Sequence, residues 1–427
     1  MSISFYKVGN LLKGMKGILV IVDGMGDTPI KQLGEKTPLE AADTPNLDFF
    51  ASRGELGYMY SVKQGFVPES DQAIVCIFGN ELIDSTRGQL EATGAGVKLT
   101  RGDLVLRANF ATIDSYKEGN FVDRRAGRNL TSEEAQMLAK AINKISMPVK
   151  FEFVPTIQHR GVLVFRGGFS DNVVGNDSTY LQGKSQSLAK IRNFKGLDDE
   201  DNTAYTVNLL NEFVKKAYDV LNNHPVNEER RKKGFLPANY ILMRGAGIEP
   251  PKLKQYKKWA AISYMPLEIG FSKLSGMNVF SFEYPPLKGN DSYENLWDGL
   301  KKACEFAIST IKKKHEDYDY FYVHLKEVDL PGHDNKPFEK KAMLEYIDQT
   351  VFAFLKEFIG KNKIKIVVTA DHSTPCRLKN HSDDPVPVLV YNNLIPKEKR
   401  FNETDAKKGS LGRIEGKDFM KKVGFAK

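Results

Sequence analysis

The chain has 427 residues, of which 41% are hydrophobic and 27% are charged, which is typical of a globular protein and excludes a mainly disordered one. Its formal net charge of +8 is mild for this length, so small anionic partners fit at least as well as nucleic acid, for which no binding signature is present. No apolar run reaches the length of a membrane helix, so we expect no membrane partner. The N-terminus has no signal-peptide pattern, and three cysteines are too few for a disulfide framework. We therefore expect a cytoplasmic protein.

The first predicted element is a strand at residues 17–22, an apolar, β-branched run of the kind that is buried on both faces of a parallel sheet. It ends in a charged, glycine-rich turn that begins with Asp23. A second strand at 58–62 precedes a helix at 73–78, and Ser70 lies just before that helix. Ser70 can therefore cap the helix or, beside a divalent metal, act as a nucleophile, and the spacing alone supports both roles equally.

The middle of the chain has a different texture, with mixed strand and helix patterns. Its predicted elements are strands at 104–113 and 151–165, helices at 131–143 and 204–221, and a polar, glycine-rich loop or lid at 167–201. We interpret residues 99–254 as a smaller α+β domain inserted into a first domain, which is formed by residues 1–98 and 255–427.

Towards the C-terminus, predicted strands alternate with amphipathic helices. The strands are expected at 318–325 and 363–369, and the helices at 293–314 and 337–358. This alternation predicts an α/β fold, in which a parallel sheet is covered by helices on both faces. In such a sheet, ligands bind at the carboxyl ends of the strands.

Aspartates and histidines follow three of these strand ends. The residues concerned are Asp23, Asp329, His333, Asp371, His372 and His381. Mixed carboxylate and imidazole ligands suit zinc, manganese and related divalent ions. Six ligands are more than one tetrahedral ion needs, but they fit a pair of ions of the kind that binds the attacking and leaving oxygens in phosphoryl transfer. Any one of these residues alone is more often a helix cap or a turn residue, but their recurrence at three strand ends favours a metal site.

Five short motifs carry a resemblance to a known family. They are Val22-Asp-Gly-Met-Gly-Asp27, Pro38-Leu-Glu-Ala-Ala-Asp-Thr-Pro-Asn46, Pro68-Glu-Ser-Asp71, Asp329-x3-His333 and Thr369-Ala-Asp-His-Ser373. Together they resemble the alkaline phosphatase superfamily and, more closely, the archaeal-type, cofactor-independent (2,3-bisphosphoglycerate-independent) phosphoglycerate mutases. Segments 88–96 and 101–110 are similar to linker and inserted-domain motifs of that family, and the resemblance runs from about residue 17 to about residue 392.

The resemblance implies an alkaline-phosphatase-like fold and an isomerase of glycolysis and gluconeogenesis that interconverts 3-phosphoglycerate and 2-phosphoglycerate. It implies a phosphoserine intermediate on Ser70, proton handling by Asp123, and no 2,3-bisphosphoglycerate. Two divalent ions are implied, manganese first and zinc, magnesium or cobalt as alternatives. One ion is expected on Asp23, Ser70, Asp371 and His372, and the other on Asp329, His333 and His381. The residues expected to bind the phosphoglycerate substrate are Arg124, Arg128, His159, Arg160, Arg244 and Lys326.

One position departs from the family pattern. Relatives commonly carry a lysine near Glu268-Ile269, so either Lys273 or Lys326 replaces it here or the activity is altered. The main alternative activity is that of a metal-dependent phosphomonoesterase or phosphodiesterase of the same superfamily. A non-catalytic carbohydrate- or nucleic-acid-binding protein with a degenerate metal site is a further alternative, which the complete ligand set disfavours. No pattern in the sequence indicates an oligomeric state.

Overall fold

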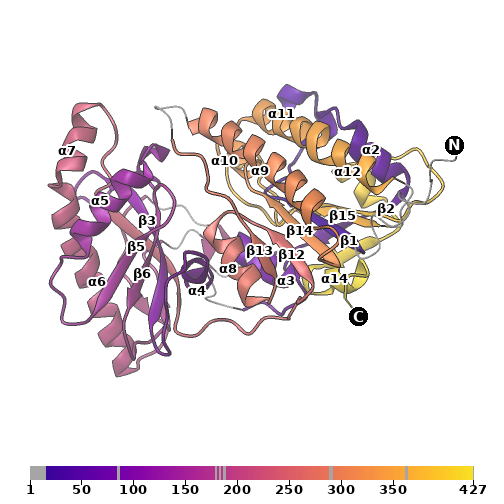
Figure 1. The fold of residues 1–427 in the computed structure, drawn as a ribbon. Helices are drawn as coiled ribbons and strands as arrows, with labels where there is room; N and C mark the ends of the chain where they lie inside the picture. The colour runs from indigo at the N-terminus through magenta and orange to yellow at the C-terminus, as the bar shows by residue number, and fades with distance from the viewer. Residues whose placement is uncertain are drawn as a thin grey trace, which may run out of the picture.

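The computed structural model of the chain describes residues 16–83, 87–177, 180–181, 184–185, 189–287, 292–360 and 364–426. The N-terminal segment in which no signal peptide is expected lies outside these residues. The described strands form two main sheets, one of eight strands and one of five, which lie in the two halves of the molecule (Figure 1). Among the described helices, none combines the length and the apolar character needed to cross a bilayer.

The larger sheet has the first predicted strand near its centre. From edge to edge its strands are β13 (Asn278–Phe280), β12 (Trp259–Ile262), β14 (Tyr320–Leu325), β1 (Gly17–Val22), β15 (Lys365–Thr369), β16 (Val386–Tyr391), β2 (Gly54–Tyr60) and β17 (Gly412–Glu415). All neighbouring pairs are parallel except those of β16, which runs antiparallel to β15 and to β2. Every residue of β1 is buried, which explains its unbroken apolar run.

Helices cover both faces of this sheet, as predicted for the α/β class. Figure 1 shows α2, α9, α11 and α12 on one side and α3, α8 and α14 on the other. The helices of this half are η1 (Lys31–Leu33), α1 (Pro38–Ala41), α2 (Pro45–Ser52), α3 (Ser70–Ile77), α8 (Pro266–Leu274), α9 (Ser292–Lys314), α10 (Asp329–His333), α11 (Pro337–Ile347), α12 (Ala353–Ile359), α13 (Glu403–Lys407), η4 (Gly416–Asp418) and α14 (Phe419–Lys422).

The predicted continuous helix at 337–358 is wrong in one detail, because a π-helical turn, η3 (Asp348–Phe352), separates α11 from α12. Asp348 in this turn is buried and accepts hydrogen bonds from the backbone N–H groups of Asn46, at 3.2 Å, and Leu47, at 2.7 Å. Those groups belong to the first turn of α2, whose amide groups have no partner within the helix. The π-turn therefore brings a carboxylate to the N-terminus of a neighbouring helix.

The smaller sheet is antiparallel and carries its own helices. Its strands are β11 (Tyr240–Gly247), β3 (Leu104–Ile113), β6 (Arg160–Phe165) and β5 (Phe151–Pro155), with β4 (Phe121–Asp123) paired to β3. The helices of this half are η2 (Ala126–Arg128), α5 (Ser132–Ile142), α6 (Asp201–Asn222) and α7 (Pro225–Lys232), and α4 (Arg87–Gly94) lies between the two halves. Thr131 caps α5, because its hydroxyl accepts from Glu134 N at 3.1 Å, so the predicted capping pattern is confirmed.

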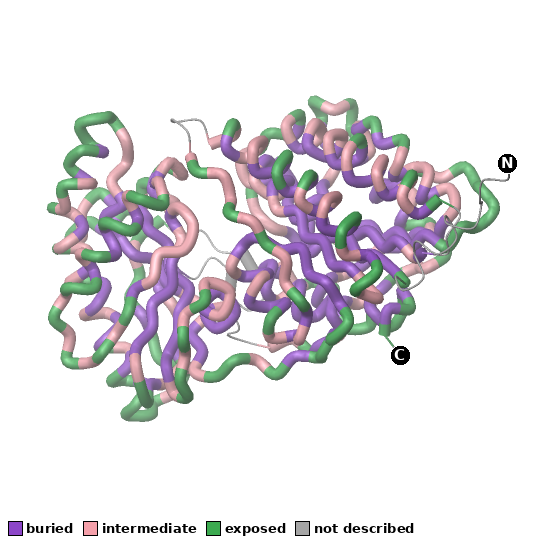
Figure 2. Tube along the Cα trace, viewed as in Figure 1, coloured by how far each residue is buried: buried purple, intermediate pink, exposed green. Residues whose placement is uncertain are grey.

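The two sheets have separate hydrophobic cores. One core contains buried side chains from residues 18–90 and 253–425, and the other contains side chains from residues 104–246. Figure 2 shows the buried chain concentrated in the two sheets and the exposed chain on the outer helices. Helix α4 lies against β3 and β11 on one side and against α8 on the other. The crossing with α8 requires glycine, because a Cβ at Gly94 would lie 1.7 Å from Pro266 O and one at Gly270 would lie 1.8 Å from Leu90 O.

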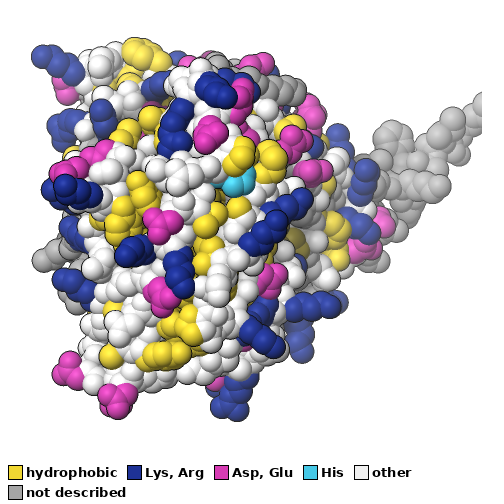
Figure 3. All heavy atoms as spheres, turned by 90° about the vertical axis from the view of Figure 1, so that its left-hand side faces the viewer, with side chains coloured by type: hydrophobic (Ala, Val, Ile, Leu, Met, Phe, Trp, Pro, Cys, Tyr) yellow, Lys and Arg dark blue, Asp and Glu magenta, His cyan; other side chains and the backbone are white. Residues whose placement is uncertain are grey.

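The glycine-rich tract 167–201 is only partly the loop or lid that its composition predicts. It contains the short strands β7 (Val173–Val174), β8 (Tyr180–Leu181), β9 (Lys184–Ser185) and β10 (Lys195–Gly196). Asn176 and Asp177 are 1% exposed, because this part of the tract lies against β11. On the outer face of the same half, over α5, α6 and α7, Figure 3 shows lysine and arginine interspersed with acidic and apolar side chains.

A buried glutamate beneath the turn after β1 makes stability depend on pH. Glu403 accepts hydrogen bonds from Thr37 Oγ1 at 2.7 Å and Asp27 N at 3.2 Å, and burial raises its pKa to about 7. The folded chain therefore holds this proton more tightly than the unfolded chain. We expect the free energy of unfolding to fall by about 3 kcal/mol between pH 4.5 and pH 7 because of this group.

Urea unfolding of the wild type and of Glu403→Gln at several pH values checks this expectation. The variant should lose this part of the pH dependence, since its amide does not titrate. A variant whose unfolding free energy follows the wild-type pH profile would contradict the assignment.

Candidate active site and metal centre

The three strand ends that the sequence singles out meet at one edge of the larger sheet. Strands β1, β14 and β15 are adjacent and parallel, so the residues that follow them lie side by side. Asp23 follows β1, Asp329 and His333 lie in α10 shortly after β14, and Asp371 lies two residues after β15. The predicted convergence of these residues is therefore observed.

A first cluster surrounds the ring of His372. Its Nε2 lies 3.2 Å from Ser70 Oγ, 3.2 Å from Asp23 Oδ1 and 3.4 Å from Asp371 Oδ2. Ser70 is the first residue of α3, and the residue in the N-cap position is Glu69. The interpretation of Ser70 as an N-cap is therefore wrong, and its hydroxyl faces the metal-ligand candidates instead.

A second cluster surrounds Asp329. Its Oδ2 lies 3.3 Å from His333 Nε2, and its Oδ1 lies 3.7 Å from His381 Nε2. The opposite ring nitrogens contact backbone carbonyls, His333 Nδ1 at Lys379 O (3.0 Å) and His381 Nδ1 at Pro68 O (2.8 Å). The rings of His372 and His381 stack with centroids 3.7 Å apart, so the two clusters are contiguous.

The hydrogen bonds determine which nitrogen of each ring carries a proton. A carbonyl only accepts, so Nδ1 of His333 and of His381 must donate. Thr374 Oγ1 donates to Asp329 Oδ1 at 2.6 Å, so it accepts from His372 Nδ1 at 3.1 Å. All three rings thus carry a proton on Nδ1 and turn Nε2 towards carboxylates. Burial lowers the pKa of His372 to about 3 and that of His381 well below its usual value, which keeps both rings neutral.

This arrangement fits divalent cations. Lone pairs and carboxylates that face one another repel unless a cation lies between them. Among the described residues, Asp23 Oδ1 and Asp371 Oδ2 are buried without a hydrogen-bond partner. Three sets of residues could each hold an ion, because the ligand atoms within each set lie within 4.8 Å of one another. The sets are Asp329, His333 and His381; Asp23, Asp329 and His372; and Asp23, His324 and Asp371.

His324 is a member of these groups that the sequence analysis missed. It lies inside β14 and is fully buried, with Nε2 3.9 Å from Asp23 Oδ2 and 3.8 Å from Asp371 Oδ2. Its Nδ1 is 2.7 Å from the hydroxyl of Tyr322. A histidine within an apolar strand resembles an ordinary core residue, and only the register of β14 beside β1 brings it to the two carboxylates.

Two buried contacts hold the ligand loops in place. Gly24 has a φ of +61°, and a Cβ at this position would lie 2.7 Å from Asp329 Oδ1, so only glycine allows the turn after β1. Lys340 of α11 is fully buried and donates to Asp27 Oδ2 at 2.9 Å, Gly26 O at 3.0 Å and Thr374 O at 3.0 Å. It therefore ties the loop after β1 to the loop after β15.

Lys326 is one of the two lysines expected to replace the missing family lysine. Its ammonium forms an ion pair with Asp23 and lies 2.8 Å from Glu268 Oε1. Burial opposes its charge, but the carboxylates of Asp23 and Glu268 raise its pKa, so it stays protonated. Lys326 lines the cavity described next, whereas Lys273 is not among its lining residues.

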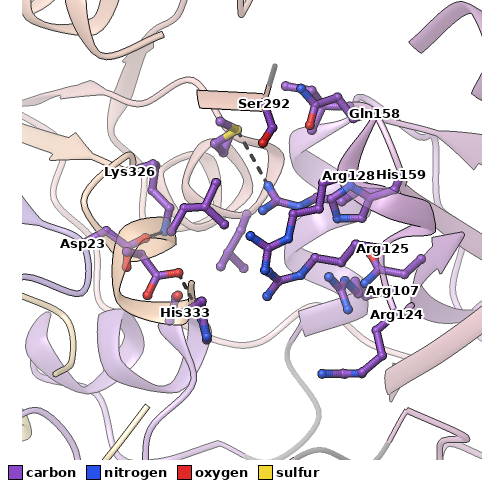
Figure 4. A pocket seen from close by; sticks show the side chains of 18 of the residues that line it. Asp23, Arg107, Arg124, Arg125, Arg128, Gln158, His159, Ser292, Lys326 and His333 are labelled. Carbon is purple, nitrogen blue, oxygen red and sulfur yellow. Dashed lines mark hydrogen bonds and ion pairs between the residues drawn. The ribbon is translucent and has the colours of Figure 1, made fainter. Parts of the chain in front are cut away.

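A cavity of about 540 Å³ separates the metal-ligand candidates from the smaller sheet. Figure 4 shows Asp23, Lys326 and His333 on one side of it and a set of basic side chains on the other. The predicted site residues that line it are Asp23, Ser70, Asp123, Arg124, Arg128, His159, Arg160, Arg244, Lys326, Asp329, His333 and His381. Asp371 and His372 lie behind this lining and are fully buried.

The candidate substrate residues differ in what they contact. Asp123 Oδ1 accepts from Arg125 N at 2.7 Å and from Gly127 N at 2.9 Å, which fixes the turn that follows β4. Arg128 crosses the cavity to an ion pair with Asp334, the residue after α10. Burial and the neighbouring arginines lower the pKa of His159 well below its usual value, so its ring is neutral.

An ion-pair network behind the arginines was not predicted. Arg244 Nη2 lies 2.7 Å from Glu69 Oε2, and Arg87 Nη1 lies 3.0 Å from the same oxygen. Arg107 and Asp177 belong to the same network. Arg107 and Asp177 are 70 positions apart in the chain, so no local spacing could have paired them.

The chain is similar to a set of named proteins. The profile of the family described as 2,3-bisphosphoglycerate-independent phosphoglycerate mutase matches residues 51–227. A protein with that description from Thermococcus kodakarensis is 39% identical over 419 residues, which cover 96% of each chain. One from Pyrococcus abyssi is 40% identical over 416 residues, which cover 95% of this chain and 96% of the relative.

Two solved structures are similar to this chain over almost its whole length. A protein structure from Pyrococcus horikoshii has 32% sequence identity and a TM-score of 0.72, and the match covers 97% of this chain and 98% of that one. A structure described as the cofactor-independent phosphoglycerate mutase from Thermoplasma acidophilum has 28% identity and a TM-score of 0.55, with 96% and 99% coverage.

Proposed function

Because the chain belongs to the 2,3-bisphosphoglycerate-independent phosphoglycerate mutases, we propose how its own residues carry out that reaction. As a member of this family it is an isomerase of glycolysis and gluconeogenesis that interconverts 3-phosphoglycerate and 2-phosphoglycerate, and it needs no 2,3-bisphosphoglycerate. A cytoplasmic location is part of the proposal, since the substrate is a small phosphorylated metabolite.

Ser70 is the proposed nucleophile. The observation that carries this assignment is the contact of Ser70 Oγ with His372 Nε2 at 3.2 Å, inside the cavity and beside both ligand clusters. Its oxygen attacks phosphorus, the bond from phosphorus to the substrate oxygen breaks, and glycerate is released within the cavity. Glycerate then turns and takes the phosphoryl group back on its other hydroxyl. The position of Ser70 at the N-terminus of α3 favours a phosphate there.

Asp123 is the proposed proton carrier for glycerate. Its Oδ1 is engaged by two backbone amides, which fixes the carboxylate at the cavity wall of the smaller sheet. In the first half of the reaction the leaving glycerate oxygen needs a proton, and in the second half the attacking hydroxyl must lose one. A single carboxyl group on the glycerate side of the cavity can perform both transfers.

Two divalent ions are proposed, with manganese as the expected metal. Asp23, Ser70, Asp371 and His372 would hold one ion, and Asp329, His333 and His381 would hold the other. Bound ions would lower the pKa of the serine hydroxyl and neutralise phosphate charge. The lone pairs and unpartnered carboxylate oxygens described above support this assignment.

The basic side of the cavity is proposed to bind the substrate's carboxylate and phosphate. The residues concerned are Arg124, Arg128, His159, Arg160 and Arg244 on that side, joined by Lys326 from the side of the metal-ligand candidates. Guanidinium groups bind both anions through paired N–H groups, and a neutral His159 can add a further hydrogen bond. Exclusion of water by this wall would keep the phosphoryl group from being hydrolysed.

Residues 99–254 are proposed to form the substrate-binding domain, and residues 1–98 with 255–427 the catalytic domain. The second sheet and its separate core support this division. The two connecting segments touch through an exposed ion pair, Arg101 Nε to Glu249 Oε1 at 3.7 Å.

We expect trypsin to cut at these connecting segments, near residues 97–102 and 249–257, and saturating 3-phosphoglycerate to slow the cleavage by closing the cavity. Gel electrophoresis and mass spectrometry of the fragments check this result. The same cleavage rate with and without substrate would count against closure of the inserted domain.

Phosphorus NMR tests the proposed function directly. Protein loaded with manganese and supplied with 3-phosphoglycerate should produce 2-phosphoglycerate until the two reach equilibrium, with little free phosphate. Free phosphate as the main product would support the phosphomonoesterase alternative instead. Because the readout separates the two products, either outcome is decisive.

A further inference from the structure

A single carboxylate lies behind three arginines of the cavity wall. Asp177 is fully buried and does not line the cavity itself. It contacts Arg107 Nη1 at 3.3 Å, Arg244 Nη1 at 3.6 Å, and Arg124 through a short ion pair. All three arginines line the cavity, and Figure 4 shows Arg107 and Arg124 on the side that faces Asp23 and His333.

The short sequence Gly175-Asn176-Asp177 builds this position. A Cβ at residue 175 would lie 2.2 Å from Met243 O, so only glycine lets the chain approach β11 this closely. Asn176 accepts from Met243 N at 2.6 Å and donates to Ile241 O at 3.0 Å, and the N–H of Asp177 donates to Met243 O at 3.1 Å. The carboxylate is therefore fixed to the strand that carries Arg244.

The three arginines come from different elements. Arg107 lies in β3, Arg244 in the neighbouring β11, and Arg124 just after β4. Guanidinium groups gathered this closely repel one another, and burial together with Arg244 lowers the pKa of Arg107. Burial opposes a charge on Asp177, but the arginines outweigh it and lower its pKa, so the carboxylate stays ionised. Asp177 is the acceptor that all three share.

We propose that Asp177 is a positioning residue that holds Arg107, Arg124 and Arg244 as one rigid anion-binding set facing the metal centre. Each of these three contacts uses one terminal nitrogen, and a guanidinium has five N–H donors, so the contact with Asp177 does not by itself exhaust the donors of any of the three. Glu69, the residue before Ser70, engages Arg244 at 2.7 Å and links this set to the nucleophile. The inference rests on the proposed function, because it assigns the arginines to the phosphoglycerate.

A positioning role has a kinetic signature that a purely structural role lacks. Replacing Asp177 with asparagine removes a negative charge beside the arginines, so the positive potential that attracts the substrate increases. The arginines also lose the acceptor that fixes their geometry, and a displacement of about 1 Å can cost about 100-fold in rate. We therefore expect kcat to fall about 10- to 100-fold in Asp177→Asn, while KM for 3-phosphoglycerate stays unchanged or decreases.

The test compares kcat and KM of the manganese-loaded wild type with those of Asp177→Asn, Asp177→Glu and Asp171→Asn. Asp177→Glu keeps the charge but moves the carboxylate outward, so kcat should fall here too. If Asp177→Asn does not fold, Asp177→Glu decides the question. Asp171→Asn is the matched control, since Asp171 lies in the same tract and accepts from Ile248 N at 3.3 Å, and it should behave as wild type.

Three outcomes separate the possibilities. A fall in kcat without a rise in KM supports the positioning role. Wild-type kcat in Asp177→Asn or in Asp177→Glu overturns it, and so does a fall in kcat that is accompanied by a rise in KM. A wild-type protein that forms no 2-phosphoglycerate overturns the proposed function itself, whatever the variants do.

Discussion

Replacing Ser70 with alanine is expected to lower mutase turnover by several orders of magnitude while the fold is retained. The hydroxyl lies 3.2 Å from His372 Nε2 and at the start of α3, and Ser70 Oγ is the proposed acceptor of the phosphoryl group. Since the loss removes the nucleophile itself, kcat should fall far more than substrate affinity. Cysteine and threonine at this position should also fail, because the position of the attacking oxygen must hold to about 0.5 Å.

The matched control for this variant is Ser132→Ala. Ser132 is the first residue of α5, just as Ser70 is the first residue of α3, so the two substitutions make the same change at the same helix position. Ser132→Ala should keep its turnover. If Ser70→Ala retains a substantial part of the wild-type rate, a water molecule must attack the phosphoryl group, and the phosphatase reading takes over.

Loss of a metal ligand is expected to have the second largest effect. Asp371→Asn and His372→Ala should each lower the affinity for manganese by at least about 100-fold, since even changes outside the ligand sphere cost about 10- to 100-fold. Activity should fall with metal occupancy and recover in part at high manganese concentration. Equilibrium dialysis with elemental analysis measures the occupancy, and circular dichroism checks that the variants fold.

A buried histidine outside the site provides the control for this series. His315 contacts Lys312 O at 2.9 Å through Nδ1, and His315→Ala should keep its metal content. Wild-type protein that is fully active after exhaustive treatment with a chelator, and free of divalent metal by elemental analysis, would contradict the metal assignment.

The features predicted correctly from the sequence are those with a local signature. A continuous apolar run identified β1, and runs rich in aromatic or β-branched residues identified β14 and β15. The residues just beyond these strands identified most of the metal-ligand candidates, because parallel neighbouring strands end at the same edge. Thr131 and the glutamate three residues later predicted the start of α5 for the same local reason.

The features that were missed depend on contacts between distant segments. β16 has the same apolar composition as a parallel strand, and only its pairing with β15 and β2 reveals its direction. The π-turn at Asp348 follows from contacts with Asn46 and Leu47, about 300 positions away. Neither feature changes the hydrophobic period that a sequence pattern reads.

In the candidate site, too, the residues that were missed depend on contacts between distant segments. His324 was overlooked because a buried histidine within a strand is usually a core residue, and its role depends on two carboxylates from neighbouring strands. Asp177 was placed in a loop or lid because glycine and polar residues surround it, whereas hydrogen bonds to β11 bury it. Composition predicts exposure on average but not at a position where a polar group has buried partners.

The most direct test of the central claim is to trap the intermediate during turnover. Manganese-loaded protein is mixed with 3-phosphoglycerate that carries phosphorus-32 and is quenched in acid within milliseconds, and the peptides are then mapped. The account predicts label on the peptide that contains Ser70, and loss of that label to 2-phosphoglycerate when unlabelled substrate is added before the quench. Turnover to 2-phosphoglycerate with no labelled Ser70 peptide at any quench time would contradict it.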